Sequence, residues 1–442
     1  MKARPHPFLL TDIAYSQLHS TRLSQSIILT GPTASGKSEH GKMVLSYLCA
    51  LKHLEESRLD PSKRSTPDRK KAKVRRGPMG WYENPFVHGP PSLHPDSVPL
   101  PAKILLSAQV VLEAFGSAKT RQNDYSSRFG RHTKVYFGGT GGDIAGGHVT
   151  TYLLETSRVT RQASNESGFQ IFYQILLGFK EKKKYHFKTM QEYKYLNNVR
   201  FEMSEETEFA TTLSALQTCG FTPAKLDFLW TVLSCVLEIG NIEFQPISGG
   251  KSSSASASTS ASTSASASAS ASTAKISDVS MVSVRVVESL LKLESGSLGK
   301  VLLQKTVNIS RGKATTVEAK VDDAILSRDY LAKALYQKAF DLIVETVNET
   351  LDHVCETTMS RALQFASSSA LSGESPTPDE PLFVSVLDMF GYENNDDDKA
   401  ADPTRPGDHK NSFEQLCINF VDEKITNQIV KSFYKSDFDL YR

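Results

Sequence analysis

The spacing of apolar residues predicts short buried strands separated by amphipathic helices. Apolar runs predict strands at 26–30, 133–137 and 382–391, the last running into a turn. Apolar residues at helical spacing predict helices over 37–52, 168–179, 226–244, 330–354 and 412–434, and Ser412 can cap the last of these. Because strands alternate with helices, the fold class is α/β.

Four segments of unusual composition interrupt this pattern. Residues 54–101 are rich in Pro, Lys and Arg, 394–410 are acidic and contain Pro, and 367–380 have the composition of a shorter loop. Residues 252–273 are only Ser, Ala and Thr, which cannot bury a core, so a disordered linker is expected.

The overall composition of the 442 residues is ordinary. With 39% hydrophobic residues and a formal net charge of +2, the chain has no general attraction for nucleic acid or an anionic membrane. No apolar run approaches the ~18 residues of a membrane span, and the N-terminus lacks the apolar core of a signal peptide. The five scattered cysteines form no CxxC motif, so a reduced, intracellular protein is expected.

The segment "GPTASGKS" at 31–38 carries the clearest chemistry. Its Gly-x-x-x-x-Gly-Lys-Ser pattern lies between a predicted strand and a predicted helix, which is the context that a P-loop requires. Backbone N–H groups would wrap the β-phosphate of a nucleotide, Lys37 would reach the β- and γ-phosphate oxygens, and the Ser38 hydroxyl would bind Mg²⁺. A glycine-rich turn without a ligand is the alternative. The predicted nucleotide-binding residues of this loop are Gly31, Pro32, Thr33, Ala34, Ser35, Gly36, Lys37 and Ser38.

Two residues of the loop depart from the ideal, and a second motif is needed beside it. Pro32 has no N–H but lies before the expected donors, whereas Ala34 would cost about 1–2 kcal/mol if its backbone must adopt a positive φ.

In "DMFG", Asp388 ends an apolar strand and can hold a Mg²⁺-bound water, and the Gly391 N–H can face the γ-phosphate. Without the P-loop, a plain turn at a strand end would be the better interpretation of this motif.

Seven segments together resemble the motor domain of the myosin family, in the family's order. The block "FGSAKTRQNDYSSRFGRHTKVYF" at 115–137 resembles its switch I, "GPTASGKSEH" its P-loop and "VLDMFGYE" its switch II. The segments "YLLETSRVTRQ", "GFQIFYQILLG", "VLEIGNIEF" and "NSFEQLCINFVDEKI" are also similar to that family. The resemblance implies a P-loop NTPase core with a mixed, incomplete central sheet flanked by helices.

In that family, ATP hydrolysis drives movement along actin. The resemblance therefore implies ATP and Mg²⁺ as cofactors, an actin filament as partner, and a cytoplasmic, cytoskeleton-associated protein. It implies Ser38 and Ser127 as the Mg²⁺ ligands, Asp388 behind them, and Asn123 in contact with phosphate oxygens. Taken without the family, a capped polar turn would better describe residues 123–127.

The catalytic residues implied by the resemblance would close the site around the γ-phosphate. Ser126 would help to position the attacking water, and Gly391 would donate its N–H to the γ-phosphate. Arg128 and Glu393 would pair when both switches close, because the guanidinium fork fits a carboxylate at two points. The alternative for this pair is a surface ion pair worth ~0–1 kcal/mol.

Three features depart from the family pattern. Tyr125 stands where the family has a second Asn. Phe390 stands beside the switch II glycine in place of a small residue, so its ring would block closure or repack it. The extra residues between Glu393 and Asn411 are expected to uncouple switch II from the helix that follows.

The extent of the chain predicts an incomplete motor domain over 1–442. The central sheet would keep four of the family's seven strands, and the P-loop strand would have one unpaired side. A truncated, catalytically inactive relic or an interaction module is the alternative to an active motor. A small-molecule kinase is a third hypothesis, against which the switch I block and "NSFEQLCINF" speak.

Two basic segments raise the question of further partners. The run 63–76 within the 54–101 insert could be a nuclear signal or a nucleic-acid patch, but no aromatic residue interleaves with it. A solvated surface loop is the preferred interpretation, and no nucleic-acid partner is expected. The segment 305–317 falls where the family has an actin-facing loop, and a plain exposed turn explains it equally well.

Overall fold

The computed structural model describes residues 6–59, 98–138, 143–163, 165–196, 205–247, 273–309, 313–369, 381–393 and 413–440. The α-helices are α1 (Pro7–Thr21), α2 (Lys37–Leu59), α3 (Leu100–Gly116), α4 (Gln170–Gly178), α5 (Glu205–Thr218), α6 (Pro223–Gly240), α7 (Met281–Leu290), α8 (Ser297–Leu303), α9 (Val321–Ser369) and α10 (Phe413–Leu440). The strands are β1 (Gln25–Leu29), β2 (Ser117–Ala118), β3 (Ser126–Ser127), β4 (Gly130–Gly138), β5 (Asp143–Tyr152), β6 (Phe244–Pro246), β7 (Ala274–Ile276), β8 (Gln304–Ile309), β9 (Lys313–Glu318) and β10 (Leu382–Asp388). The short 3₁₀ helix η3 covers Thr156–Val159.

A four-stranded mixed sheet in the order β1-β10-β4-β5 forms the centre of the molecule. β1 pairs with β10 in parallel, with Ile27 opposite Val386, and the other neighbours are antiparallel. The three predicted strands are confirmed, as is the mixed α/β class. β1 has a sheet partner on one side only among the residues that the structure describes, as foreseen for the P-loop strand.

β5 was not predicted, because two glycines interrupt its apolar pattern. A methyl group added at Gly146 would lie 2.6 Å from the Cys355 Cβ, on α9. One added at Gly147 would lie 2.7 Å from the carbonyl oxygen of Lys134. These glycines are therefore present because helices and a neighbouring strand approach the β5 backbone closely.

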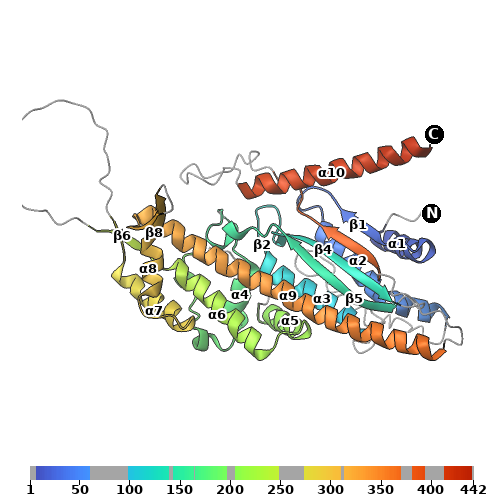
Figure 1. Ribbon diagram of the computed structural model, residues 1–442, viewed down its shortest axis with the longest axis horizontal. Coiled ribbons are helices and arrows are strands. Elements are labelled where there is room, and N and C mark those ends of the chain that lie inside the picture. The colour runs from blue at the N-terminus through green and yellow to red at the C-terminus, as the bar shows by residue number, and fades with distance from the viewer. Residues whose placement is uncertain are drawn as a thin grey trace, which may run out of the picture.

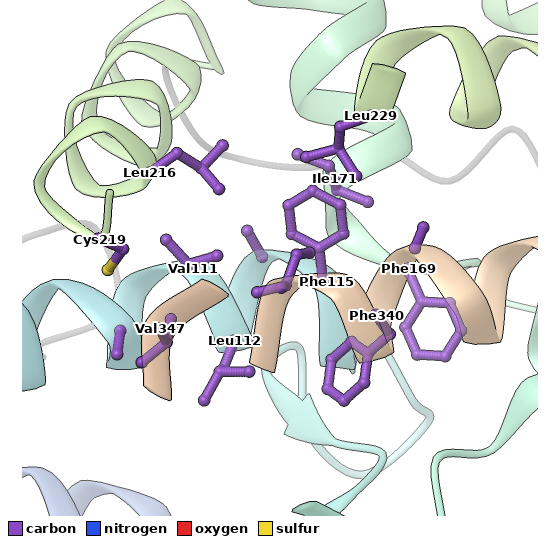
Figure 2. Close-up of a cluster of buried hydrophobic side chains, with 14 of the residues drawn as sticks. Val111, Leu112, Phe115, Phe169, Ile171, Leu216, Cys219, Leu229, Phe340 and Val347 are labelled. Carbon is purple, nitrogen blue, oxygen red and sulfur yellow. The ribbon is translucent and has the colours of Figure 1, made fainter. Parts of the chain in front are cut away.

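The helices α3 and α9 pack against β5 of the central sheet, while α4 packs on α3 and α6 packs on α9. Figure 1 shows α9 running along the molecule beside α3 and α6, with the central sheet between α9 and α10. Figure 2 shows Phe115 from α3, Ile171 from α4 and Phe340 from α9 meeting in this core. The fully buried Tyr336 stacks on Phe169 with ring centroids 4.8 Å apart and donates its hydroxyl to the carbonyl oxygen of Phe115 at 2.6 Å.

Several predicted boundaries differ from the observed ones. α9 is longer than its predicted extent of 330–354, and it continues through the first residues of the predicted loop at 367–380. The predicted insert 54–101 is helical at both ends, where α2 reaches Leu59 and α3 begins at Leu100. Residues 60–97, most of the Ser/Ala/Thr segment, the acidic segment 394–410 and the cap Ser412 lie outside the described residues.

Candidate nucleotide-binding site

The loop between β1 and α2 has the backbone of a phosphate-binding turn. Gly31, Ala34 and Gly36 have φ values of 144°, 64° and 86°. The glycines adopt such values freely, whereas the Cβ of Ala34 makes its left-handed conformation cost about 1–2 kcal/mol. The strain foreseen at Ala34 is therefore present in the loop.

Lys37, the first residue of α2, lies folded over this loop. Its Nζ donates to the carbonyl oxygens of Gly31 and Pro32, at 2.8 Å each. Burial lowers the pKa of Lys37, and nearby carboxylates, Asp388 first among them, partly offset this effect. The ammonium group is thus at the loop that would hold phosphate, and its contact with β- and γ-phosphate stays a prediction.

Gly391 of switch II packs directly on the P-loop. A methyl group added at Gly391 would lie 2.4 Å from the Thr33 amide nitrogen and 2.6 Å from the Gly31 carbonyl oxygen. The Thr33 hydroxyl lies 3.4 Å from the Gly391 carbonyl oxygen and 3.3 Å from Oε1 of Glu393. Only glycine permits this approach of the two backbones, and its donation to a γ-phosphate stays a prediction.

The two predicted Mg²⁺ ligands lie side by side. The Oγ atoms of Ser38, on α2, and Ser127, on β3, are 3.4 Å apart although 89 residues separate them in the sequence. Mg²⁺ prefers an octahedron of oxygen ligands at 2.0–2.1 Å, in which adjacent oxygens lie about 3 Å apart. The two hydroxyls therefore fit adjacent positions around such an ion.

Asp388 is the last residue of β10 and is buried. Its Oδ2 lies 3.7 Å from Nη2 of Arg131, the residue opposite it on β4. The carboxylate is therefore held within the sheet and faces the start of α2, where a methyl group added at Gly41 would lie 3.9 Å from it. This position agrees with a role behind the metal ligands, which stays a prediction.

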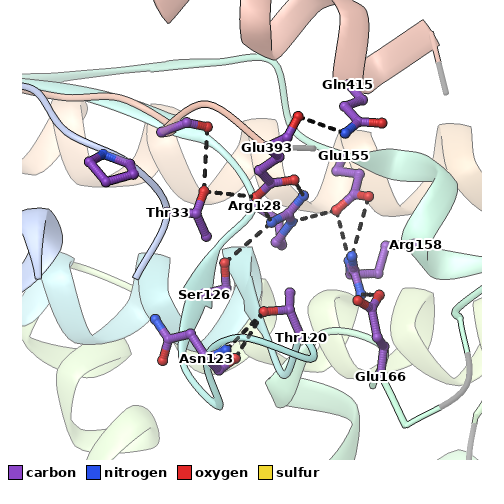
Figure 3. Close-up of polar contacts among 12 residues, drawn as sticks. Thr33, Thr120, Asn123, Ser126, Arg128, Glu155, Arg158, Glu166, Glu393 and Gln415 are labelled. Carbon is purple, nitrogen blue, oxygen red and sulfur yellow. Dashed lines mark hydrogen bonds and ion pairs between the residues drawn. The ribbon is translucent and has the colours of Figure 1, made fainter. Parts of the chain in front are cut away.

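Arg128 and Glu393 form the predicted two-point ion pair. Nη1 of Arg128 donates to Oε1 of Glu393 at 2.8 Å and Nη2 donates to Oε2 at 3.2 Å (Figure 3). The Arg128 side chain is only 4% exposed, so the alternative of a loose surface pair is wrong. Burial by itself would lower the pKa of Arg128, but the carboxylates of Glu155 and Glu393 outweigh it and raise that pKa. Nη1 also donates to the Ser126 hydroxyl at 3.2 Å.

Three charged residues that sequence analysis missed extend this pair into a buried network. Nε of Arg128 donates to Oε2 of Glu155 at 2.6 Å, and Nε of Arg158 donates to the same oxygen at 2.7 Å. Nη1 of Arg158 in turn donates to Oε2 of Glu166 at 2.9 Å. All three residues follow β5, and the segment "YLLETSRVTRQ" holds two of them, yet their partners become visible only once the sheet has formed.

Asn123 caps its own turn. Its Oδ1 accepts from the Tyr125 amide at 3.0 Å, and its Nδ2 donates to the Tyr125 carbonyl oxygen at 3.1 Å. Its carbonyl oxygen accepts from the Thr120 amide at 2.9 Å. The capped turn that the residues alone suggested is therefore formed at Asn123, and contact with phosphate oxygens stays a prediction.

Switch II is joined directly to α10. The Glu393 amide donates to Oδ1 of Asn419 at 3.0 Å, and the Glu393 carbonyl oxygen accepts from Gln415 at 2.8 Å and from Asn419 at 2.9 Å. Phe390 is buried in a small cluster with Met389 and Ile418. The expectation that switch II is uncoupled from the following helix is thus wrong, because the hydrogen bonds of Glu393 and the packing of Phe390 join switch II to α10 directly. The Phe390 ring has repacked and does not block the closed pair.

A P-loop between a parallel strand and a helix, with two further segments closing on it, defines the fold of a P-loop nucleoside triphosphatase. The family model of the myosin head (motor domain) matches residues 1–442, and the chain belongs to this family.

Known myosins match along the whole chain. Myosin-1 of Emericella nidulans is 27% identical over 451 residues, which is 100% of this chain and 28% of that protein. Myosin-J heavy chain of Dictyostelium discoideum is 30% identical over 99% of this chain and 17% of its own length. Unconventional myosin-Id of Bos taurus is 27% identical over 99% of this chain and 35% of its own length. The chain thus spans little more than a third of such relatives at most. Among the described residues, the helices are too short or too polar to cross a bilayer.

Proposed function

We propose that this chain binds Mg-ATP and hydrolyses it as part of an actin-based motor of the myosin kind. The observation that carries the proposal is the convergence on one loop of two predicted pairs, Ser38 with Ser127 and Arg128 with Glu393. Each pair joins residues from distant parts of the chain, so their meeting is a property of the fold. An actin filament as partner and a cytoplasmic, cytoskeleton-associated location belong to the same proposal.

The residues of the loop would act by position and by charge, which is what phosphoryl transfer requires. Lys37 would exchange the carbonyl oxygens of Gly31 and Pro32 for the β- and γ-phosphate oxygens. Ser38 and Ser127 would hold Mg²⁺, which when bound neutralises charge on the phosphates. Asp388 would orient water on the metal from its fixed place at the end of β10.

The closing residues would link the nucleotide to the shape of the protein. The Arg128–Glu393 pair would shield the reacting phosphate from bulk water, while Ser126, beside the guanidinium, would orient the attacking water. Because the Glu393 backbone is bound by Gln415 and Asn419, closing the pair would also fix the start of α10.

The first experiment is calorimetric titration of the chain with Mg-ATP. Lys37→Ala is expected to weaken binding about 10- to 100-fold, because a charge-assisted hydrogen bond contributes about 1.5–3 kcal/mol. Lys338→Ala, which removes a highly exposed lysine on α9, is the matched control and should leave the dissociation constant unchanged. Binding that is equally tight in both variants would contradict the assignment of the loop.

The alternative of an inactive relic is favoured by one observation, the contact of Lys37 with two carbonyl oxygens of its own loop. It expects a folded chain whose melting temperature does not respond to Mg-ADP. A shift in melting temperature with Mg-ADP that disappears without Mg²⁺ would rule this alternative out.

A further inference from the structure

Arg128 has counter-charges on two separate edges of its guanidinium group. Its Nε faces Glu155, and its Nη1 and Nη2 face Glu393. The Arg128 side chain is 4% exposed, and those of the two carboxylates are 16% and 18% exposed. One buried cation therefore lies between two anions that come from different parts of the chain.

The Glu155 side of this arrangement is fixed several times over. The Glu155 amide donates to the Arg128 carbonyl oxygen at 2.9 Å, so the two residues are joined through the backbone as well as through their side chains. Arg158 donates to both carboxylate oxygens of Glu155, at 2.7 and 3.4 Å. Arg158 is itself held by Glu166 at 2.9 Å and by the Ser167 carbonyl oxygen at 3.2 Å.

The Glu393 side is held by other elements. Its backbone is bound by Asn419 and Gln415 of α10, and its Oε1 lies 3.3 Å from the Thr33 hydroxyl of the P-loop. Glu393 is therefore held by switch II and α10 and would move with them, whereas Glu155 would move with β5 and η3. The two carboxylates can separate from each other without breaking the bonds of Glu155.

We propose that Glu155 is a positioning residue that keeps the Nη edge of Arg128 aimed at Glu393, so that the pair opens and closes through Glu393 alone. The proposal rests on the proposed function and concerns how its closing step is prepared. Because Glu155 binds Nε, the guanidinium plane keeps its direction and its Nη1 and Nη2 atoms stay turned toward Glu393.

The test is a double-mutant cycle between Arg128→Gln and Glu393→Gln, measured by urea unfolding without nucleotide. The coupling constant of this pair is expected to fall by about tenfold or more in a Glu155→Gln background, which is a change that such cycles resolve well. In a Glu166→Gln background, which spares every contact of Arg128, it should stay within about twofold. An unchanged coupling in the Glu155→Gln background would overturn the proposal.

Glu155→Asp keeps the proposal testable if Glu155→Gln does not fold. Aspartate retains the charge but withdraws the carboxylate by one methylene group, so the counter-charge stays while the aim of Arg128 is lost. The coupling between Arg128 and Glu393 should therefore fall in this background too. Equal coupling in Glu155→Asp and wild type would show that Glu155 does not aim Arg128.

A second readout separates positioning from general stability. In single-turnover hydrolysis of Mg-ATP, Glu155→Gln should slow the chemical step about tenfold or more, while the dissociation constant changes less than about threefold. Equal loss in both quantities would indicate a structural role only. If the wild-type chain neither binds nor hydrolyses Mg-ATP, the proposed function fails, whereas the nucleotide-free cycle still decides the role of Glu155.

Discussion

At the scale of single residues, Gly391 is the described glycine at which an added methyl group would come closest to other backbone atoms. Gly391→Ala would place a methyl group 2.4 Å from the Thr33 amide nitrogen, so switch II would have to move away from the P-loop. We expect a loss of about 1–3 kcal/mol in the free energy of unfolding, together with weaker Mg-ATP binding. Urea unfolding and calorimetry measure the two effects.

Gly299→Ala is the matched control for this substitution. A methyl group there would lie 3.5 Å from Cδ1 of Ile276, which is an ordinary contact, and the position is helical. Its stability should be unchanged or slightly higher, since alanine favours helices more than glycine does. Equal destabilisation by both substitutions would contradict the close packing inferred at Gly391.

The buried network of carboxylates and arginines predicts how stability depends on pH. Burial by itself would raise the pKa of Glu155, but Arg128 and Arg158 lower it from 4.5 to about 2. Because the pKa in the folded state lies below that in the unfolded state, the stabilisation is complete above about pH 4.5 and is lost as the pH falls toward 2. The difference in unfolding free energy between wild type and Glu155→Gln should therefore be constant from pH 8 to 5 and shrink below. A difference that grows on acidification would contradict the assigned charge state.

Residue patterns alone predicted chemistry that is local, whereas contacts between distant residues were either foreseen through the resemblance or missed. Gly31 and Gly36 could be recognised because each has a positive φ inside a short motif, whereas Gly391 could be recognised only together with the P-loop that it packs against. Glu155 and Arg158 could not be recognised, because their contacts with the Arg128 network form only when β5 pairs with β4. The Ser38–Ser127 contact was foreseen only through the resemblance, since nothing in the spacing of two serines indicates that they meet.

At the scale of elements, α10 is held to switch II by a small apolar cluster. Phe390→Ala would remove the ring that packs beside Met389 and Ile418. We expect a loss of about 3 kcal/mol, the low end of the range for a buried phenylalanine, and faster amide hydrogen exchange in the first half of α10. Phe433→Ala, on the exposed side of the same helix, should change stability by less than about 0.5 kcal/mol. Exchange in α10 that stays unchanged in Phe390→Ala would show that the hydrogen bonds to Glu393 suffice.

The apolar patterns predicted some elements and missed others, such as α3 and β5. The strand β10 and the helix α10 follow from apolar patterns that the structure confirms. α3 was missed because nearly its whole length is buried, so it lacks the polar face that marks an amphipathic helix. β5 was missed because its two glycines are explained by the close approach of α3 and α9, and no local sequence pattern reveals that approach.

At the scale of the whole molecule, α9 joins the parts that surround the site. Its 49 residues would extend roughly 70 Å at 1.5 Å per residue. It contacts the strand β5, the helices α3 and α6, and η3, which begins next to Glu155. One continuous helix thus contacts the sheet and the neighbouring helices of the core. It also contacts η3, next to Glu155 of the Arg128 network.

The pairing of β1 with β10 also sets an order of events during synthesis. The hydroxyls of Ser26 and Ser385 meet at 2.9 Å across 359 residues, whereas β4 and β5 are consecutive strands. At roughly 5–20 residues per second, a ribosome needs about 20–70 s to make the stretch between those two serines. The hairpin of β4 and β5 can form early in that interval, but β1 must wait for its neighbour. The phosphate-binding loop is therefore translated long before the strand that fixes its final position.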